Sequence, residues 1–515
     1  MTTETISASS PWIPNVPTHL DHLPDRIGSC FESKNIFMTG ASGFIGKVLL
    51  EKLLRITDNG KIYILLRPKK DKTFKERVAE IFSSPLYDAL KGVKKESVIY
   101  DRVIPINGDI ALTDLGISSQ DRQLLNDQIQ IVFHIAATVR FDDTMQTYVM
   151  LNTRATKNML SLSKQMSHLQ VFVYVSTAYC HPKEKVLEEK IYPPPTNPHK
   201  VIEKAELLSR KELELLKQEF LQDFPNGYAY TKCLCEGIVT EYMEAGMPCM
   251  ILRPSIIIPI WKDPLPGWTD NINGPTGLLI GAGKGIIRTM FCDHGNSADF
   301  VPVDILINGM LLSTWNFLSN QDNPMKVVNL TANKDFQITW LEITEYGKEI
   351  ARSKVPLNNV IWYPGGIITK SQLLFQISAF FYHTIPSIIL DNLLPLVGHE
   401  PVLKRVHNRI KKGFDVLEYY ANNCWAFKND NLHALGKLLN EKEKIRYDIT
   451  MFANIGEAVS YLEMCAHGAR QYLLNEPADT LPAAKTHIRR MFYVHYISQG
   501  LMLLFFFWIL SKIFL

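Results

Sequence analysis

The sequence lacks the features that mark nucleic-acid-binding, metal-binding and secreted disulfide-rich proteins. Its 55 Lys and Arg residues nearly balance its 52 Asp and Glu residues, and a formal net charge of +3 gives no electrostatic reason to expect a nucleic-acid partner. The eight cysteines are scattered. Cys233 and Cys235 form the one close pair, but a single intervening residue on a helix is poor geometry for zinc. No metal is therefore expected.

The N-terminus also lacks a secretory signal. Together with the scattered cysteines, this predicts a reducing, cytosol-facing catalytic body. Residues 1–30 are rich in Ser, Thr and Pro and predict a flexible segment. Hydrophobic residues make up 46% of the 515 residues, which is ample for real cores.

A glycine motif stands where a dinucleotide-binding turn is expected. Residues 35–38 read as a short buried strand, and residues 44–56 carry apolar residues at helical spacing. Gly40 and Gly43 between them would permit a tight turn and a close approach to a pyrophosphate, and Gly46 in the first turn of the helix would permit close packing of the helix on the strand. A glycine-rich turn without a ligand is the alternative. The candidate cofactor residues here are Thr39, Gly40, Ser42, Gly43, Phe44, Ile45 and Gly46.

The strands that follow add candidate cofactor contacts. The strand over residues 61–66 ends in Arg67, with Lys70 close behind, and basic side chains at this point suit the 2′-phosphate of NADP rather than the bare ribose of NAD. NADPH is therefore the expected cofactor, and a solvated basic loop is the alternative. Asp109, Ala136 and Ala137 follow two further strands. Ligands in open α/β sheets bind beyond such strand ends.

A second motif can move a proton. A fifth strand, residues 171–175, leads into Ser176 and Thr177, while Tyr228 and Lys232 lie four residues apart on a predicted helix and share one face. Reduction of a carbonyl needs an acid for the oxygen. A nearby ammonium is expected to lower the tyrosine pKa from about 10 towards working pH. The alternative for Tyr228 and Lys232 is an amphipathic surface pair.

In these motifs the chain resembles the extended short-chain dehydrogenase/reductases, and specifically the fatty acyl-CoA reductases. The similarity rests on segments 39–46, 65–67, 174–179, 228–232 and 252–255. It continues through segments 298–304, 382–386 and 468–474, and so covers most of residues 31–480. The later segments are the more specific to this family.

The resemblance implies NADPH-dependent reduction of a long-chain acyl-CoA to a primary alcohol by two hydride transfers through a bound aldehyde. It also implies catalytic roles for Tyr228, Lys232 and a hydroxyl residue. For the hydroxyl, Thr177 is the first choice and Ser176 the second. Asn152 matches an asparagine that helps to position the lysine. A homo-oligomer is left open.

The expected architecture is a Rossmann-like doubly wound parallel sheet followed by a helical domain. The boundaries expected are residues 31–355 for the NADP-binding reductase domain and 356–484 for the C-terminal helical domain. Residues 183–220 are charged and proline-containing, and predict a loop followed by an exposed helix before Tyr228.

The C-terminus carries a candidate membrane segment over residues 491–513. Lys485, His487, Arg489 and Arg490 precede it and would keep the body on the cytosolic side, at the endoplasmic reticulum or the peroxisome. A buried helix and a shallow interfacial helix are the alternatives. Residues 373–397, interrupted by polar residues, predict core or a membrane-touching surface.

Two rival functions remain open at this point. The first is a membrane-bound reductase of the same fold that acts on a sterol or another lipid. The second is a catalytically silent lipid-binding homologue, against which the intact Thr177, Tyr228 and Lys232 argue.

Overall fold

The computed structural model describes residues 14–320, 322–332, 335–393, 395, 400, 413–414 and 417–514. The chain forms two compact units, each assembled from three segments. The first comprises residues 1–266, 299–336 and 425–451, and the second comprises residues 267–298, 337–424 and 452–515. The domains expected from the sequence, residues 31–355 and 356–484, are each one continuous segment, whereas each compact unit combines three separate segments.

The first unit is built on a parallel sheet. Seven strands of the described chain run in the order β12-β7-β5-β4-β1-β2-β3, and every neighbouring pair is parallel. The chain order therefore reverses between β1 and β4, where open α/β sheets bind their ligands. The strands are β1 (Ile36–Thr39), β2 (Ile62–Leu66), β3 (Val103–Asn107), β4 (Ile131–His134), β5 (Val171–Val175), β7 (Cys249–Pro254) and β12 (Val327–Leu330).

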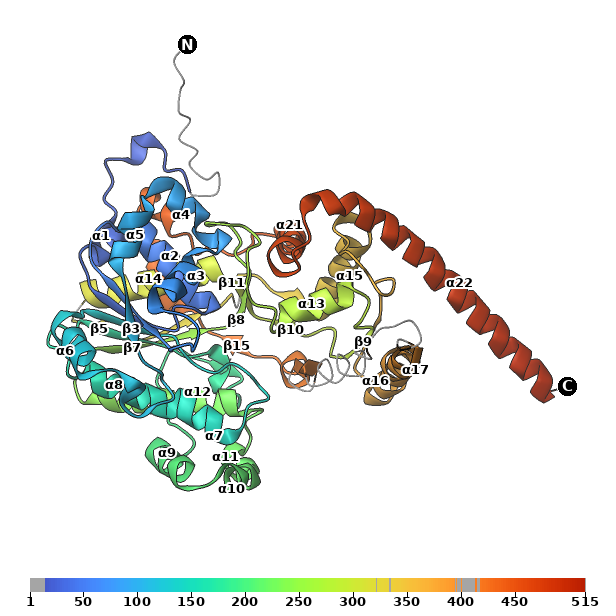
Figure 1. Ribbon diagram of the computed structural model, residues 1–515, viewed down its shortest axis with the longest axis horizontal. Helices are drawn as coiled ribbons and strands as arrows, with labels where there is room; N and C mark the ends of the chain where they lie inside the picture. The colour runs from blue at the N-terminus through green and yellow to red at the C-terminus, as the bar shows by residue number, and fades with distance from the viewer. Residues whose placement is uncertain are drawn as a thin grey trace, which may run out of the picture. The chain divides into compact units, whose positions relative to one another are not determined.

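Helices cover both faces of this sheet (Figure 1). Helices α2 (Phe44–Ile56) and α14 (Val303–Ser319) pack together on one face, and α8 (Ala155–Ser163) and α12 (Gly227–Glu244) pack together on the other. The doubly wound α/β fold expected from the sequence is confirmed. Further helices before α8 are α3 (Phe74–Phe82), α4 (Asp88–Val93), α5 (Glu96–Arg102), α6 (Ser119–Gln128), α7 (Met145–Tyr148) and the π-helix Val149–Arg154.

The region between β5 and α12 is more broken than the sequence predicts. Residues 183–220 do not form a loop and one helix. They form the short strand β6 (Val186–Leu187) and the helices α9 (Pro198–Leu207), α10 (Arg210–Leu215) and α11 (Lys217–Leu221). Asn197 caps α9, and Ser209 caps α10 with a reciprocal bond to Glu212. These caps start new helices where the charge pattern alone reads as one continuous helix.

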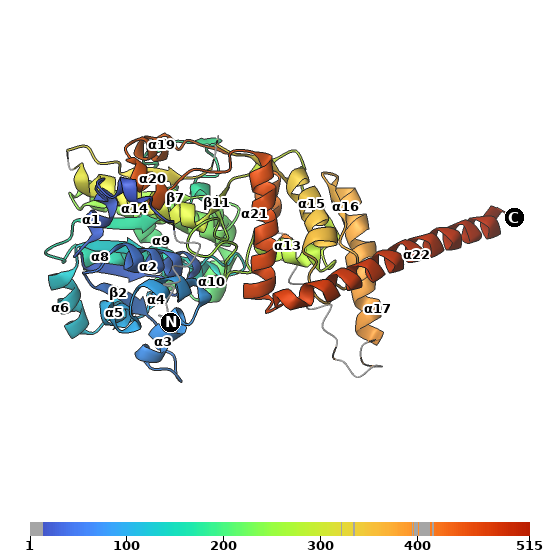
Figure 2. The same ribbon diagram turned by 90° about the horizontal axis from the view of Figure 1, so that it is seen from above.

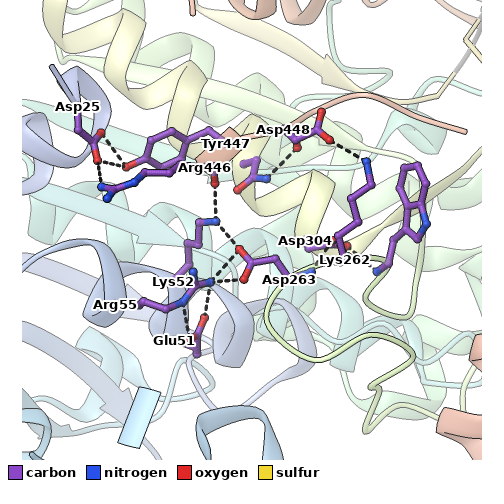
Figure 3. A network of polar contacts seen from close by, with 12 residues as sticks. Asp25, Glu51, Lys52, Arg55, Lys262, Asp263, Asp304, Arg446, Tyr447 and Asp448 are labelled. Atoms are coloured by element: carbon purple, nitrogen blue, oxygen red, sulfur yellow. Dashed lines mark hydrogen bonds and ion pairs between the residues drawn. The ribbon is translucent and has the colours of Figure 1, made fainter. Parts of the chain in front are cut away.

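A buried ionic network joins distant segments within the first unit (Figure 3). Lys52 of α2 lies 2.7 Å from Asp263, and Arg55 lies 2.8 Å from the other Asp263 oxygen and from Glu51. Lys52 also donates to the carbonyl of Arg446 at 2.8 Å. The network therefore ties the cofactor-side helix α2 to the segment 425–451, which contains β15 (Ala426–Phe427), α19 (Asp430–Lys437) and α20 (Glu441–Arg446).

The same segment holds the N-terminal part of the chain. Arg446 lies 2.7 Å from Asp25, and Arg26 lies close to Glu443 at 2.5 Å. Asp25 caps α1 (Arg26–Phe31), whose Ile27 and Phe31 are buried. The flexible segment expected over residues 1–30 thus lies outside the described residues up to residue 13, whereas its last residues form an ordered, capped helix.

The second unit is mainly helical (Figure 2). Its core gathers Ile280, Leu357, Val360, Ala469 and Ile488. Two small sheets, β10-β13 and β14-β9, support it. The elements are α13 (Pro275–Gly283), β9 (Thr289–Phe291), β10 (Ser297–Ala298), β13 (Ile338–Thr339), α15 (Trp340–Glu349), β14 (Ile367–Thr369), α16 (Gln372–Ala379), the π-helix Phe380–Thr384, α17 (Ile385–Leu393), α21 (Ile455–Gly468) and α22 (Leu481–Phe514).

Helix α22 contains the candidate membrane segment. Within the described residues, one helix over 478–512 is long and apolar enough to cross a bilayer by length and composition, and its most apolar window is not buried. The buried-helix alternative therefore does not describe this segment. The preceding part of α22 belongs to the fold, because Ile488 is buried and His487 lies 2.8 Å from the Val360 carbonyl.

Candidate active site

The glycine turn between β1 and α2 has the geometry that a dinucleotide requires. Gly40 adopts φ +78°, and a side chain there would meet the Ala136 backbone nitrogen at 2.9 Å. A side chain at Gly46 would collide with the Gly40 carbonyl. Glycine is therefore required at Gly40 by conformation and at Gly46 by close packing of helix on strand.

The N-terminus of α2 is left open for an anion. Gly43 is its N-cap and has no side chain with which to cap the first turn. Ser42 and Gly43 are exposed, and Phe44 and Ile45 are half-buried. Because the first N–H groups of a helix have no partner within the helix, this turn offers donors and a positive dipole end to a pyrophosphate. The residues present therefore fit a dinucleotide.

The turn is held against β4 by a small polar relay. The Thr39 hydroxyl accepts from the backbone nitrogens of Ile135 and Ala136 at 3.2 Å and lies 2.8 Å from His134 Nδ1. Burial lowers the pKa of His134 to about 3, so the ring is neutral. Ala136 and Ala137 are half-buried beyond the end of β4, as expected from the sequence. The relay fixes the switch point between β1 and β4.

The other candidate cofactor contacts lie at neighbouring strand ends. Asp109 is half-buried after β3, and its carboxylate accepts from the Ala111 nitrogen at 3.0 Å. Arg67 and Lys70 are exposed after β2. Within the described residues neither of these two cations makes an ion pair, whereas Lys69 and Lys72 both lie near Glu80. Arg67 and Lys70 thus remain available to a phosphate.

Tyr228 meets the hydroxyl of Thr177. Tyr228 lies in the first turn of α12, which Asn226 caps, and Thr177 follows β5. Burial raises the pKa of Tyr228, and a side-chain hydrogen bond with Thr177 opposes that rise. The Thr177 hydroxyl is oriented by the Tyr179 nitrogen, which donates to it at 3.3 Å. The structure thus brings together the phenol and the hydroxyl that the sequence selected.

Lys232 follows one turn later on α12 but does not lower the pKa of Tyr228 as the sequence predicts. Its ammonium donates to the Val175 carbonyl at 2.6 Å and lies 4.9 Å from the centre of the Tyr174 ring. Burial lowers the pKa of Lys232 to about 8. The prediction that Lys232 lowers the tyrosine pKa is wrong for this structure, because burial dominates at Tyr228 and the ammonium is bound elsewhere.

Ser176 and Asn152 occupy supporting positions. Ser176 is buried, and its hydroxyl donates towards Cys180 Sγ at 3.6 Å. The Asn152 side chain accepts from the Thr138 nitrogen at 2.8 Å and donates to the Thr231 hydroxyl at 3.0 Å. Asn152 therefore holds the residue next to Lys232 rather than the ammonium.

The sequence motifs do not predict a buried cluster of charged and polar side chains around Glu236 of α12. Glu236 lies one turn beyond Lys232, and Arg253 of β7 bonds both of its oxygens, at 2.7 and 2.9 Å. His181 lies 2.9 Å from the same carboxylate, and Cys180 lies 3.2 Å from it. Burial raises the pKa of Glu236, but Arg253 and His181 outweigh it and lower the pKa overall.

Cys180, His181 and Glu236 are close enough to hold a metal ion. Arg253 already provides the positive charge at that carboxylate, so the cluster is complete as an ion pair. A signal for it existed in the sequence: a carboxylate at helical spacing after Lys232 and an arginine inside an apolar strand both demand buried partners.

The parallel sheet, its switch point and the glycine turn define a dinucleotide-binding protein of the Rossmann-like α/β class. The comparisons with known proteins narrow this class. Two models described as male sterility protein match, a NAD-binding model over residues 38–310 and a second model over residues 382–476.

The chain is 36% identical over 467 residues to fatty acyl-CoA reductase 1 of Rattus norvegicus, covering 90% of each protein. It is 31% identical over 466 residues to the fatty acyl-CoA reductase wat of Drosophila melanogaster, covering 90% of this chain and 89% of that protein. The chain therefore belongs to the fatty acyl-CoA reductase family.

Solved structures support the fold alone. The terminal R domain of the myxalamid pathway superposes with a TM-score of 0.56 at 18% identity, over 86% of this chain and 92% of that chain. The reductase domain of a nonribosomal peptide synthetase from Mycobacterium tuberculosis gives 0.57 at 16% identity, over 87% and 93%.

Proposed function

We propose that this protein reduces long-chain fatty acyl-CoA to a primary fatty alcohol with two molecules of NADPH. The observation that carries the proposal is the hydrogen bond between Thr177 and Tyr228 at the carboxyl end of the sheet, in a chain whose relatives are named fatty acyl-CoA reductases. The reductase domain, residues 31–355, would carry the chemistry.

The residues that would hold the cofactor fall into three groups. The open N-terminus of α2 would bind the pyrophosphate through backbone N–H groups. Asp109, Ala136 and Ala137 would line the adenine and nicotinamide ribose, and Arg67 and Lys70 would bind the 2′-phosphate that distinguishes NADPH from NADH. The cofactor supplies the hydride for each of the two reductions.

In the first reduction, Thr177 would hold the thioester oxygen and Tyr228 would donate a proton to it as charge develops there. The neutral form of Tyr228 is favoured by burial, which suits a proton donor. The carbon–sulfur bond then breaks as the oxygen gives its proton back to Tyr228. Coenzyme A leaves as a thiolate, which takes a proton from solvent, so the products are an aldehyde and free coenzyme A. A thiolate is a tolerable leaving group because thiol pKa values are about 8.5.

In the second reduction, the aldehyde oxygen would occupy the same place between Thr177 and Tyr228. Tyr228 again gives the proton, and the product is the primary alcohol. Lys232 would return protons to Tyr228 and bond the cofactor ribose, helped by Asn152 through Thr231. The intermediate must stay bound during cofactor exchange, and each buried CH₂ of a long chain contributes about 0.8 kcal/mol to its retention.

The tail would anchor this enzyme in a membrane. Residues 491–513 of α22 contain the apolar stretch, and the basic residues before it favour a cytosol-facing catalytic body, at the endoplasmic reticulum or the peroxisome. The helical domain, residues 356–484, would connect this anchor to the reductase domain.

The proposal is tested by product analysis on the purified full-length chain. Acyl-CoAs of varied length are supplied with NADPH, and products are identified by mass spectrometry, with a hydroxysteroid as the control substrate. We expect fatty alcohol from long-chain substrates. Turnover of the hydroxysteroid instead would favour the rival lipid reductase, and inactivity at every chain length would favour a silent homologue.

A further inference from the structure

A second apolar surface lies on the helical unit, apart from α22. Residues 371–390 contain no charged side chain. Along α16, the π-helix and α17, six large apolar side chains are each between 47% and 66% exposed. We call them the α16–α17 apolar face: Leu373, Leu374, Ile377, Phe380, Phe381 and Ile388.

Two polar residues of this helical segment are turned inward. His383 and Ser387 are buried, and His383 Nε2 accepts from the backbone nitrogen of Arg288 at 2.9 Å. The exposed apolar side chains recur every three or four residues, and the exposed polar residues among them, Gln372 and Gln376, are uncharged. A helix on the surface of a soluble protein places its apolar stripe inward and its polar residues outward. Here six large apolar side chains lie outward, so the surroundings of this exposed side are expected to be apolar.

Direct contacts connect this rod to α22. The Arg288 guanidinium lies 4.5 Å from the centre of the Tyr382 ring and 5.4 Å from that of Trp362. Trp362 donates from its indole nitrogen to His495 Nδ1 of α22 at 3.0 Å. His495 lies near the start of the charge-free stretch 491–511.

The residues that form this connection are those that prefer a bilayer interface. Tryptophan and tyrosine gather at the level of the lipid headgroups, where arginine also bonds phosphate. The connection therefore lies where α22 would enter the membrane. This continuity with the candidate span favours lipid, rather than a protein partner, as the cover of the apolar face.

We propose that the α16–α17 apolar face lies in the interface of the same bilayer that α22 enters, with its side chains among the upper acyl chains of phospholipid. This inference rests on the membrane anchoring in the proposed function. The helical unit then contacts the membrane at two places, which restrains its tilt as a single anchor cannot.

The test uses the full-length chain in phosphatidylcholine vesicles that carry a diazirine on the acyl chain near the glycerol. After photolysis, adducts are mapped by mass spectrometry. We expect adducts on peptides from 373–388 and from 491–511. Peptides with Leu207 and Leu215, which are 76% and 84% exposed in the reductase unit, serve as the internal control and should remain unlabelled.

A pair of matched variants makes the test specific. Leu374→Glu with Phe381→Glu should reduce labelling of 373–388 by about fivefold or more while α22 stays labelled, because interfacial binding scales with buried apolar area. Leu207→Glu with Leu215→Glu should change nothing. All four side chains are exposed, so these substitutions remove no core contact.

Three other labelling results would each overturn a different part of the proposal. Labelled α22 with unlabelled 373–388 overturns this inference alone. If neither segment is labelled, the membrane anchoring itself fails. If 373–388 is protected and the chain is a dimer that Leu374→Glu with Phe381→Glu dissociates, a second copy covers the face and the inference is wrong.

Discussion

Two buried lysines of the first unit, Lys52 and Lys232, differ in the groups that contact their ammonium. Lys52 lies 2.7 Å from Asp263, donates to the Arg446 carbonyl and completes a network with Arg55 (Figure 3). Lys232 donates to the Val175 carbonyl and faces the Tyr174 ring, and no ion pair is formed by it within the described residues.

The difference separates a structural charge from a functional one. A buried ion pair is costly to break, because removal of one partner leaves the other charge uncompensated. Burial lowers the pKa of both lysines, but the contact with Asp263 opposes this lowering at Lys52. Lys232, with a pKa of about 8, can exchange a proton near neutral pH. The two lysines therefore predict opposite consequences of substitution, one for stability and the other for turnover.

The largest effect is expected at the phenol that Lys232 would serve. Tyr228→Phe should lower alcohol formation by about 10²–10⁴-fold because it removes the proton donor, while NADPH affinity stays nearly unchanged. Tyr230→Phe is the control, since Tyr230 is buried on the same helix and its hydroxyl lies 2.9 Å from the Thr196 hydroxyl. Product formation and cofactor titration are measured together. Full turnover by Tyr228→Phe would refute its role as acid.

Substitution of each lysine by methionine tests whether Lys52 serves stability and Lys232 serves turnover. Lys52→Met should cost about 3 kcal/mol of stability, the lower end for a broken buried pair, because Arg55 still faces Asp263. Turnover per folded molecule should be retained. Lys232→Met should show the reverse, with a small change in the thermal midpoint and a large loss of turnover. Equal losses of stability in both variants would remove the distinction.

Arg67 offers a third kind of cation, exposed rather than buried. Arg67→Asp should weaken NADPH by about 10–100-fold, the loss of one charge-assisted hydrogen bond, and should leave NADH nearly unaffected. Lys69→Asp is the matched control because Lys69 already lies near Glu80. Dissociation constants for both cofactors decide the result, and equal weakening of NADPH and NADH would overturn the cofactor choice.

The smallest expected effect is the change of turnover and of the free energy of unfolding with pH. Turnover should fall as pH rises through about 8, where Lys232 loses its proton. Its folded pKa lies below the unfolded value of about 10.4, so the unfolded chain binds more protons between these values and the free energy of unfolding should rise with pH. Opposite trends in activity and stability would identify the titration.

The matched pH control exchanges each lysine for arginine. Lys232→Arg should move the alkaline fall in turnover to higher pH, because arginine keeps its proton, while Lys52→Arg should leave the profile as it is. An unchanged alkaline limb in Lys232→Arg would contradict the assignment.

The sheet and its ligand edge were predictable because buried parallel strands are continuous apolar runs. The helix 44–56 and the strand 171–175 have the predicted bounds, and Gly40 and Gly46 meet the predicted geometric demands. Local signals of this kind lie within one strand, one turn or one helix.

What the sequence did not reveal depends on tertiary contact. Glu236 and Arg253 are paired across elements, and α1 is held through Arg26 by Glu443, 417 residues away. The raised pKa of Tyr228 follows from burial, which the Tyr-x-x-x-Lys spacing does not reveal. The catalytic and cofactor roles of the candidate residues stay predictions.

The most direct test of two hydride transfers with Tyr228 as the proton donor supplies the purified full-length chain with palmitoyl-CoA and with NADPH deuterated at the transferable position. Two reductions, each by one molecule of NADPH, predict hexadecanol with two deuterium atoms on the carbon that bears the hydroxyl, and about 10²–10⁴-fold less of this product from Tyr228→Phe. Alcohol without deuterium, or equal labelled product from Tyr228→Phe, would contradict it.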